Sequence, residues 1–203
     1  MLKKDLINQW KNSGLIKDDN LLDAFKKVKR EKFVLNKKTA YEDRAFPILC
    51  NQTISQPSTV MIMLQALELK ENDNVLEIGT GSGYNLALIC KIVKRNVYSV
   101  EVHKELIEFA ENNLKKSKIN NYKIFRQNGY LGLKKYAPFD KIILTAAPVE
   151  IPFELIKQLK LNGIIVAPIG NYPQRMLRII KKEDGLVKQD LGEFVFVPMI
   201  NST

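Results

Sequence analysis

The chain has 203 residues, of which 45% are hydrophobic and 27% are charged. This composition is typical of a folded globular protein with a sizeable core, and the length corresponds to one domain. No apolar run is long enough to cross a bilayer, and the basic N-terminal stretch lacks the apolar segment and cleavage site of a secretory signal. We therefore expect a cytoplasmic monomer that makes no membrane contact.

The formal net charge of +10 raises the question of a polyanionic partner such as nucleic acid. The lysines are scattered over predicted solvent faces, and no basic block approaches the length that marks nucleic-acid-binding tails. The charge pattern therefore disfavours dedicated nucleic-acid binding.

The spacing of the Cys, His, Asp and Glu residues does not predict a metal site or a redox motif. Cys50 and Cys90 form no metal-ligand or redox motif, and we expect both thiols to be reduced. The single histidine, His103, falls at a predicted helix start, where we expect a surface role. No His, Asp and Glu cluster has metal-ligand spacing, so no metal is predicted.

The first part of the chain predicts helices around an irregular segment. Apolar residues at helical spacing predict an amphipathic helix over 2–12, and Asp18 to Asn20 offer N-caps for a second. Residues 30–57 have poor periodicity, and a long irregular segment of this kind is usually functional or disordered. Its aromatic residues argue against disorder. Pro57 fits the first turn of a helix running to residue 69, with Ser55 or Gln56 near the cap.

Strands and helices alternate through the rest of the chain. The sequence predicts strands over 74–78, 96–102, 122–127, 141–146 and 163–170, and helices over 83–93, 103–116 and 152–160. This alternation predicts βαβ units and a mostly parallel, doubly wound sheet of the α/β class. Residues 175–182 and 186–197 alternate across Glu183-Asp184-Gly185 and predict a C-terminal antiparallel hairpin.

The segment VLEIGTGSGY, residues 75–84, joins a buried strand to a helix through a glycine turn containing Gly79, Gly81 and Gly83. Glycine accepts positive φ and lets backbone N–H groups approach a ligand closely. A dinucleotide fingerprint would need a glycine where Tyr84 stands, so that pattern fails. The E-x-G-x-G-x-G pattern that begins at Glu77 resembles the first motif of Rossmann-like S-adenosylmethionine methyltransferases. The alternative is an ordinary glycine turn.

Three further candidates fall at the carboxyl ends of predicted strands, where such sheets bind ligands. Glu101 ends the second strand, where a carboxylate can accept hydrogen bonds from both ribose hydroxyls. The alternative interpretation of Glu101 is a solvent-exposed acid at a strand end. Asn128-Gly129 follows the third strand, where a side-chain amide can hydrogen-bond the adenine edge. The alternative interpretation of this pair is an ordinary Asn-Gly turn. The turn at 145–148, TAAP, is the predicted mouth for the acceptor.

The TAAP turn narrows the acceptor chemistry. Methylation of a nucleobase amine usually involves a polar-Pro-Pro-aromatic turn at this place, and TAAP offers no such group. A carboxylate acceptor has a pKa near 4, so it is already an anion at neutral pH and needs alignment rather than proton removal. The sequence therefore favours carboxyl O-methylation.

Several longer segments resemble the protein-L-isoaspartate (D-aspartate) O-methyltransferase family. The resemblance runs from about residue 21 to the end of the chain, and its most specific pieces are QTISQP at 52–57 and APFDKIILTAAP at 137–148. REKFV at 30–34, AYEDRAFPI at 40–48, IPFELIKQLK at 151–160, APIG at 167–170 and FVPM at 196–199 extend it.

The resemblance implies methyl transfer from S-adenosylmethionine to the free carboxyl of L-isoaspartyl, and of D-aspartyl, residues in damaged polypeptides. The ester then cyclises to a succinimide, and S-adenosylhomocysteine is the other product. It implies a single domain, with N-terminal helices and a substrate loop over 1–57 and a cofactor-binding core over 58–203. Ser55 would be the catalytic residue, with an N-cap as its alternative role. The residues implied to bind the cofactor are Thr53, Ile54, Ser58, Glu77, Gly79, Gly81, Gly83, Glu101, Asn128, Gly129 and Gln174.

Three departures from the family pattern bear on activity. Leu49-Cys50-Asn51 stands where glycines are usual in the loop that closes over the substrate. Asn128 replaces an aspartate, which should weaken cofactor binding somewhat, and Lys29 replaces a common proline. A cofactor-binding module with reduced activity therefore remains as one alternative, and the net charge of +10 leaves an RNA-directed methyltransferase as another.

Overall fold

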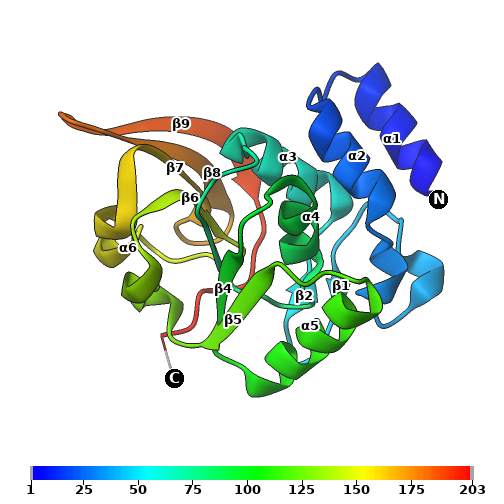
Figure 1. Ribbon diagram of the computed structural model, residues 1–203. Coiled ribbons are helices and arrows are strands. Elements are labelled where there is room, and N and C mark those ends of the chain that lie inside the picture. Colours follow the sequence, from blue (N-terminus) through cyan, green and yellow to red (C-terminus); the bar gives the residue numbers. More distant parts are fainter. Residues whose placement is uncertain (1, 202–203) are drawn as a thin grey trace.

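The computed structural model of the chain describes residues 2–201. Its centre is a seven-stranded sheet, with helices on both sides of it in Figure 1. The strand order is β5-β4-β3-β6-β7-β8-β9. The strands are β3 (Val75–Ile78), β4 (Val97–Glu101), β5 (Tyr122–Arg126), β6 (Phe139–Leu144), β7 (Leu159–Ile169), β8 (Gln174–Lys182) and β9 (Gly185–Phe194).

The sheet is parallel from β5 through β7, and β8 and β9 add an antiparallel hairpin at one edge. Helices α4 (Tyr84–Ile92) and α5 (Lys104–Lys116) connect the parallel strands, and α6 (Phe153–Gln158) precedes β7. This arrangement confirms the predicted mostly parallel, doubly wound α/β fold with a closing hairpin.

Alternate residues along the central strands feed two cores on opposite faces of the sheet, as the strand period of two requires. On β6, Ile143 joins one cluster while Ile142 and Leu144 join the other. The first cluster also takes side chains from α1 (Lys3–Asn12), α2 (Asp19–Lys27), α3 (Pro57–Leu67), α4 and α5. The second cluster contains Leu155 of α6. The sheet is therefore buried on both faces, which explains its near-continuous apolar strands.

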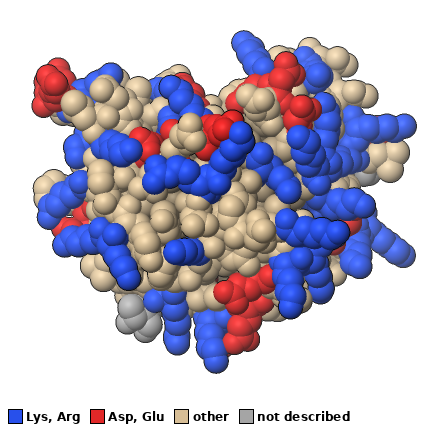
Figure 2. Space-filling view, in the orientation of Figure 1, with Lys and Arg blue, Asp and Glu red and all other residues tan. Residues whose placement is uncertain are grey.

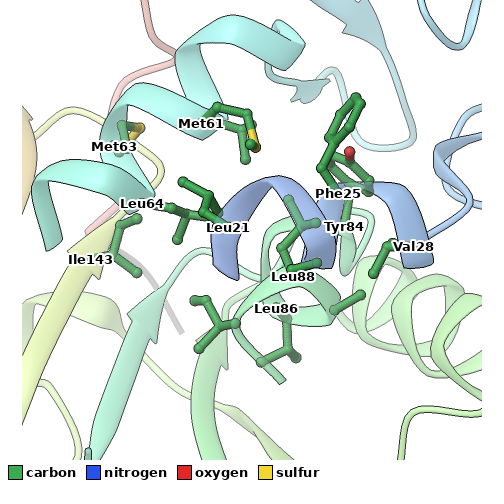
Figure 3. Close-up of a cluster of buried hydrophobic side chains, with 14 of the residues drawn as sticks. Leu21, Phe25, Val28, Met61, Met63, Leu64, Tyr84, Leu86, Leu88 and Ile143 are labelled. Atoms are coloured by element: carbon green, nitrogen blue, oxygen red, sulfur yellow. The ribbon is translucent and has the colours of Figure 1, made fainter. Parts of the chain in front are cut away.

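The N-terminal helices pack into the same core as the sheet rather than forming a separate one. Figure 3 shows Leu21 and Phe25 of α2 beside Met61 and Leu64 of α3, with Leu88 of α4 close by. In Figure 1 the blue helices α1 and α2 lie on the side of the molecule where α3 and α4 cover the sheet. The predicted helix over 2–12 is confirmed, and the Asp18 side chain caps α2 by accepting from the backbone N–H groups of Asn20 and Leu21.

Several element ends differ from the predicted ones, and two of them lie near the sheet edge that binds ligands or next to β7. The predicted strand over 141–146 ends instead at Leu144, since Thr145 turns back to donate to the carbonyls of Ile78 and Gly79. The predicted helix over 152–160 ends at Gln158, and the chain enters β7 directly.

The irregular segment over 30–57 is ordered. It contains two single-turn helices, η1 (Arg30–Lys32) and η2 (Lys37–Thr39), and a small sheet of β1 (Phe46–Pro47) and β2 (Thr53–Ile54). The two short strands pair antiparallel, with Phe46 opposite Ile54. This small sheet fixes residues 48–52 as a turn beside the main sheet. Within residues 2–201, no helix combines the length and apolar character that crossing a membrane would need.

Candidate active site

A pocket, the main pocket, opens beyond the carboxyl ends of β3, β4 and β6. Its floor includes Gly79, Gly81 and Glu101, and its walls include Thr53 from β2 and Gly129 after β5. These are the strand ends at which the sequence placed a ligand. The C-terminal residues Val197, Pro198, Met199 and Ile200 also line this pocket. Their FVPM segment carried no site prediction, because its spacing gives no sign that it folds back over the sheet.

The glycine turn is shaped by the residue that follows β6. Gly79 has φ of +94°, and a Cβ there would lie 2.4 Å from Oγ1 of Thr145. That hydroxyl donates to the carbonyl of Gly79 at 2.6 Å and lies 3.1 Å from that of Ile78. Only glycine fits this conformation and this contact without strain. Thr145 therefore fixes the turn and stands in the pocket wall, where the sequence had placed an acceptor mouth.

Glu77 lies beneath the turn rather than in the pocket. Its side chain is fully buried, and its carboxylate accepts from Nδ2 of Asn85 at 2.8 Å and from Oγ of Ser99 at 2.6 Å. Burial raises the pKa of this carboxyl to about 7, against the lowering influence of these two donors. The side chain joins β3, β4 and α4 below the glycine turn.

Glu101 faces the main pocket and is held by backbone donors. One carboxylate oxygen accepts from the N–H of Gly81 at 3.0 Å, and the other accepts from Val102 at 2.8 Å and His103 at 3.2 Å. The bond to Gly81 ties the end of β4 to the glycine turn. A carboxylate in this position presents a negative edge to a ligand in the pocket.

Two other predicted glycines have packing reasons for their identity. A Cβ on Gly83, which has φ of +81° and precedes α4, would lie 3.2 Å from Cβ of Ala110. A Cβ on Gly129 would lie 2.5 Å from Cγ2 of Ile78. Gly129 lines the main pocket, whereas Gly83 sits behind it against α5.

Asn128 and Gln174 are nearly buried and are engaged with the C-terminal segment. Asn128 Oδ1 accepts from the N–H of Tyr130 at 2.9 Å, and its Nδ2 donates to Oδ1 of Asn201 at 2.7 Å. Gln174 Oε1 accepts from the N–H of Phe196 at 2.9 Å. Both side chains thus hold residues 196–201, which carry part of the pocket wall.

Two further hollows adjoin the main pocket. The middle hollow is lined by Thr53, Ile54 and Ser55 on one side and by the glycine turn on the other. The outer groove is lined by Thr53 and Ser55 together with residues of α3 and residues 193–196. Thr53 borders all three spaces, and Ser55 borders the middle hollow and the outer groove.

Ser55 does not cap the helix that follows it. The N-cap of α3 is Gln56, and no side chain of the cap residue bonds the helix. Asp43 supplies an acceptor instead, taking the N–H of Ser58 at 2.8 Å. The alternative role of Ser55 as an N-cap is therefore wrong, and the cap is Gln56, the other residue that the sequence offered for it. Its backbone carbonyl accepts from Nη2 of the buried Arg30 at 2.7 Å, a residue whose REKFV segment gave no sign of this role.

Ser58 is buried in a chain of hydrogen bonds from the N-terminal helix. Its Oγ accepts from Nε1 of Trp10 at 2.6 Å and donates to Oδ2 of Asp43 at 2.6 Å. Ser58 borders the outer groove but not the main pocket or the middle hollow. It therefore lies on the side of the loop away from the glycine turn.

His103 lies in the wall of the main pocket, a position that the expected surface role did not include. It is the N-cap of α5, and its Nε2 is buried with no hydrogen-bond partner among residues 2–201. Cys50 and Glu105 lie beside it, with 4.0 Å between Sγ of Cys50 and Oε2 of Glu105. Partial burial and the carboxylates of Glu105 and Glu101 raise the pKa of the Cys50 thiol.

Comparisons with known proteins agree on one family. The family model described as protein-L-isoaspartate(D-aspartate) O-methyltransferase matches residues 1–203. The protein-L-isoaspartate O-methyltransferase of Pyrococcus horikoshii is 43% identical, covering 98% of this chain and 96% of its own. That of Flavobacterium psychrophilum is also 43% identical, covering 98% and 94%.

Solved structures give the same result. A crystal structure described as a protein-L-isoaspartate O-methyltransferase from Plasmodium falciparum, in complex with S-adenosyl-L-homocysteine, superposes with a TM-score of 0.86 at 28% identity. The superposition covers 98% of each chain.

Proposed function

Because the chain belongs to the protein-L-isoaspartate(D-aspartate) O-methyltransferase family, we propose that it methylates the free carboxylate of L-isoaspartyl residues in damaged polypeptides. The methyl donor is S-adenosylmethionine, and S-adenosylhomocysteine is released. The ester is then attacked by the neighbouring backbone nitrogen with loss of methanol, and the resulting succinimide reopens in part to normal aspartate. The methylation thereby initiates repair.

The residues of the main pocket fit this cofactor. Its apolar walls, which include Val100, Leu106 and Met199, suit an adenine ring and a thioether chain, and the Glu101 carboxylate suits ribose hydroxyls. The backbone of Gly79 and Gly81 is open to the pocket because neither carries a side chain. When bound, the cofactor supplies an electrophilic sulfonium methyl group. Roles in binding it are also proposed for Thr53 and Ile54.

The observation that carries the proposal is the position of Ser55. It borders the middle hollow, which shares Thr53, Gly79 and Thr145 with the main pocket, and it also borders the outer groove. An acceptor peptide lying in the outer groove would reach the cofactor side past Thr53 and Ser55. We assign the Ser55 hydroxyl the task of holding the acceptor carboxylate so that one oxygen faces the methyl group.

The reaction asks little more of the protein than alignment. The acceptor is ionised at neutral pH, so a carboxylate oxygen attacks the methyl carbon while the carbon–sulfur bond breaks, and no proton has to be removed. Tyr84, a titratable side chain of the middle hollow, is buried, and burial raises the pKa of its phenol far above neutrality. It is therefore unsuited to act as a base. Methyl transfer therefore depends on two residues: Ser55 orients the acceptor carboxylate, and Glu101 positions the cofactor.

Five of the remaining predicted residues support the site from behind it. Glu77 and Gly83 hold the glycine turn against α4 and α5, whereas Asn128 and Gln174 hold the C-terminal segment in the pocket wall. Ser58 fixes the start of α3 through Asp43. We propose that these residues affect cofactor binding through the shape of the pocket.

The two alternatives are weaker on these observations. Figure 2 shows basic side chains dispersed around the visible face, with acidic side chains among them, rather than one continuous basic stripe. On this face, the RNA-directed alternative has no support beyond the net charge. The reading as a module of reduced activity is disfavoured because Ser55 and Glu101 both border the connected hollows.

The test is a labelling experiment with the full chain and methyl-labelled cofactor. Four acceptors are offered separately: an isoaspartyl peptide, its normal aspartyl twin, its D-aspartyl twin and bulk tRNA. We expect base-labile label on the isoaspartyl peptide and none on the aspartyl twin or tRNA, while the D-aspartyl arm measures how far the family's second substrate is accepted. Base-stable label on tRNA, or cofactor binding with no labelled acceptor, would contradict the proposal.

A further inference from the structure

Three side chains that can ligate metals converge beside the main pocket, which one of them, His103, lines. Cys50 comes from the turn between β1 and β2, His103 is the N-cap of α5, and Glu105 lies in the first turn of that helix. One ligand atom from each lies within 4.8 Å of the others, and Sγ of Cys50 is 4.0 Å from Oε2 of Glu105. Separate parts of the chain thus present a thiol, an imidazole and a carboxylate to one point.

This donor set matches zinc and similar borderline-soft divalent ions. Zn²⁺ takes sulfur at about 2.3 Å and nitrogen or oxygen at about 2.0–2.2 Å in a tetrahedron, which puts neighbouring ligand atoms roughly 3.5 Å apart. Since the three atoms lie within 4.8 Å of one another, each pair needs to approach by about 1.3 Å at most. Glu105 is exposed and Cys50 is half-buried, so side-chain rotation can supply much of this movement.

The imidazole is not committed to a structural bond at its buried edge. Nε2 of His103 is inaccessible to solvent and has no hydrogen-bond partner in the described part of the chain. A buried polar atom without a partner costs free energy, and reorientation of the ring onto a metal ion would relieve that cost. The adjacent Lys104 does not oppose a cation directly, because its ammonium lies 3.6 Å from the carboxylate of Glu108 one turn along the helix.

The cluster bridges a loop and a wall of the cofactor pocket. Cys50 and Asn51 have φ of +57° and +55°, and they directly precede Gln52 and Thr53, which line the main pocket. His103, the N-cap of α5, also lines this pocket. An ion held by all three side chains would fasten the β1–β2 turn to the start of α5.

We propose that Cys50, His103 and Glu105 form a binding site for a zinc-class divalent cation, and that the bound ion slows methyl transfer by fastening the β1–β2 turn across the pocket mouth. The ion takes no part in the chemistry. The slowing rests on the proposed function, whereas the binding does not, so the two are measured separately.

Binding is tested first with the chelator-treated full chain. Zn²⁺ is titrated calorimetrically, and Co²⁺ is titrated in the visible and near-ultraviolet, where a cobalt–thiolate bond gives a charge-transfer band. We expect one ion per chain and a band that Cys50→Ser abolishes. Cys90→Ala is the matched control, because Cys90 is buried on α4 with its Sγ directed at the carbonyl of Asn121. It should leave the titration unchanged.

A second variant guards against an effect of Cys50→Ser on folding. Glu105→Gln alters an exposed side chain and should weaken Zn²⁺ binding by at least about tenfold, a loss no smaller than that for a supporting residue of a metal site. Equal affinity in the parent, Cys50→Ser and Glu105→Gln proteins, or no cobalt–thiolate band in the parent, would overturn the site.

Turnover is then measured with the isoaspartyl peptide. Stoichiometric Zn²⁺ should lower the rate of the parent protein, a chelator should restore it, and Cys50→Ser should be insensitive. Zinc binding with unchanged turnover would overturn the fastening of the turn. A parent protein without methyl transfer would contradict the proposed function, while the calorimetric and spectroscopic results would still decide the site.

Discussion

The guanidinium of Arg30 donates a 2.7 Å hydrogen bond from Nη2 to the backbone carbonyl of Ser55. The Nε of Arg30 donates to the carbonyl of Ala40 at 2.8 Å, and the guanidinium carbon Cζ lies 4.7 Å from the ring centre of Tyr84. Arg30 is fully buried, and this burial lowers its pKa from the ordinary arginine value. One buried cation therefore connects the irregular segment, the proposed acceptor loop and helix α4.

Arg30→Met should destabilise the protein and slow transfer. The substitution leaves two carbonyls without their charged donor, so we expect the free energy of unfolding to fall by about 2–4 kcal/mol. Arg30→Lys keeps the charge but loses the planar arrangement of donors, so its free energy of unfolding should lie between those of the parent and Arg30→Met proteins. Urea unfolding measures the change, with the exposed Arg95→Met as control. A midpoint equal to that of the parent would show that the Arg30 bonds contribute no net stability.

Ser55→Ala should lower kcat by roughly tenfold to a hundredfold, the effect of losing one hydrogen bond to a charged group. The dissociation constant for S-adenosylmethionine and the urea midpoint should be unchanged, because Ser55 caps no helix. Steady-state kinetics with the isoaspartyl peptide and calorimetry with the cofactor separate these quantities. A fully active Ser55→Ala protein would remove Ser55 from the reaction.

Glu101→Gln should weaken cofactor binding by roughly tenfold, and Glu101→Ala by more, because the carboxylate both faces the pocket and accepts the N–H of Gly81. Calorimetry with S-adenosylhomocysteine gives the dissociation constants. Glu111→Gln, on the exposed side of α5, is the control. Identical constants for the Glu101→Ala and parent proteins would place Glu101 outside the binding site.

Gly79→Ala should cost more stability than Gly170→Ala, although both glycines have similar positive φ values of +94° and +102°. An added Cβ at Gly79 meets Oγ1 of Thr145 at 2.4 Å, whereas at Gly170 it meets nothing within 4 Å. The comparison thus separates the clash from the backbone strain, which by itself costs about 1–3 kcal/mol. Thermal unfolding of both variants measures the difference. Equal losses would mean that the loop relaxes away from Thr145.

Glu77→Gln should flatten the dependence of stability on pH. Burial raises the pKa of Glu77 from 4.5 to about 7, so the folded protein holds this proton more tightly than the unfolded chain. The contribution of Glu77 to the free energy of unfolding is therefore largest below pH 4.5. This contribution, about 3 kcal/mol in total, is lost as the pH rises through about 7.

The measurement is the free energy of unfolding of both proteins between pH 5 and 8. Glutamine is nearly isosteric, and its amide can still accept from Asn85 and donate to Ser99, whose hydroxyl can then turn to Thr80 at 2.6 Å. We expect the parent to lose stability relative to Glu77→Gln as the pH rises. A constant difference across this range would show that Glu77 does not titrate there.

Much of the local structure follows from nearest neighbours in the chain. The glycine turn after Ile78, the cap at Asp18 and the hairpin across Glu183 and Asp184 all lie where the sequence predicts them. Side-chain periodicity and backbone preference are properties of short segments, so they can be recognised without knowledge of the fold. The same holds for Glu101, whose place at a strand end puts it at the ligand edge of a parallel sheet.

The roles of individual side chains depend on contacts between segments that are distant in the sequence. Glu77 belongs to the glycine motif, yet it points into the core because α4 presents Asn85 to it and β4 presents Ser99. Cys50 and Glu105 are 55 residues apart and meet only because β1, β2 and α5 pack around one pocket. The sequence determined the sheet, the methyl-transfer chemistry and the ligand edge, because these depend on periodicity and on motifs of a few residues. The tertiary structure alone decided which side chains face the ligand and which support the turn, because packing sets the direction of each side chain.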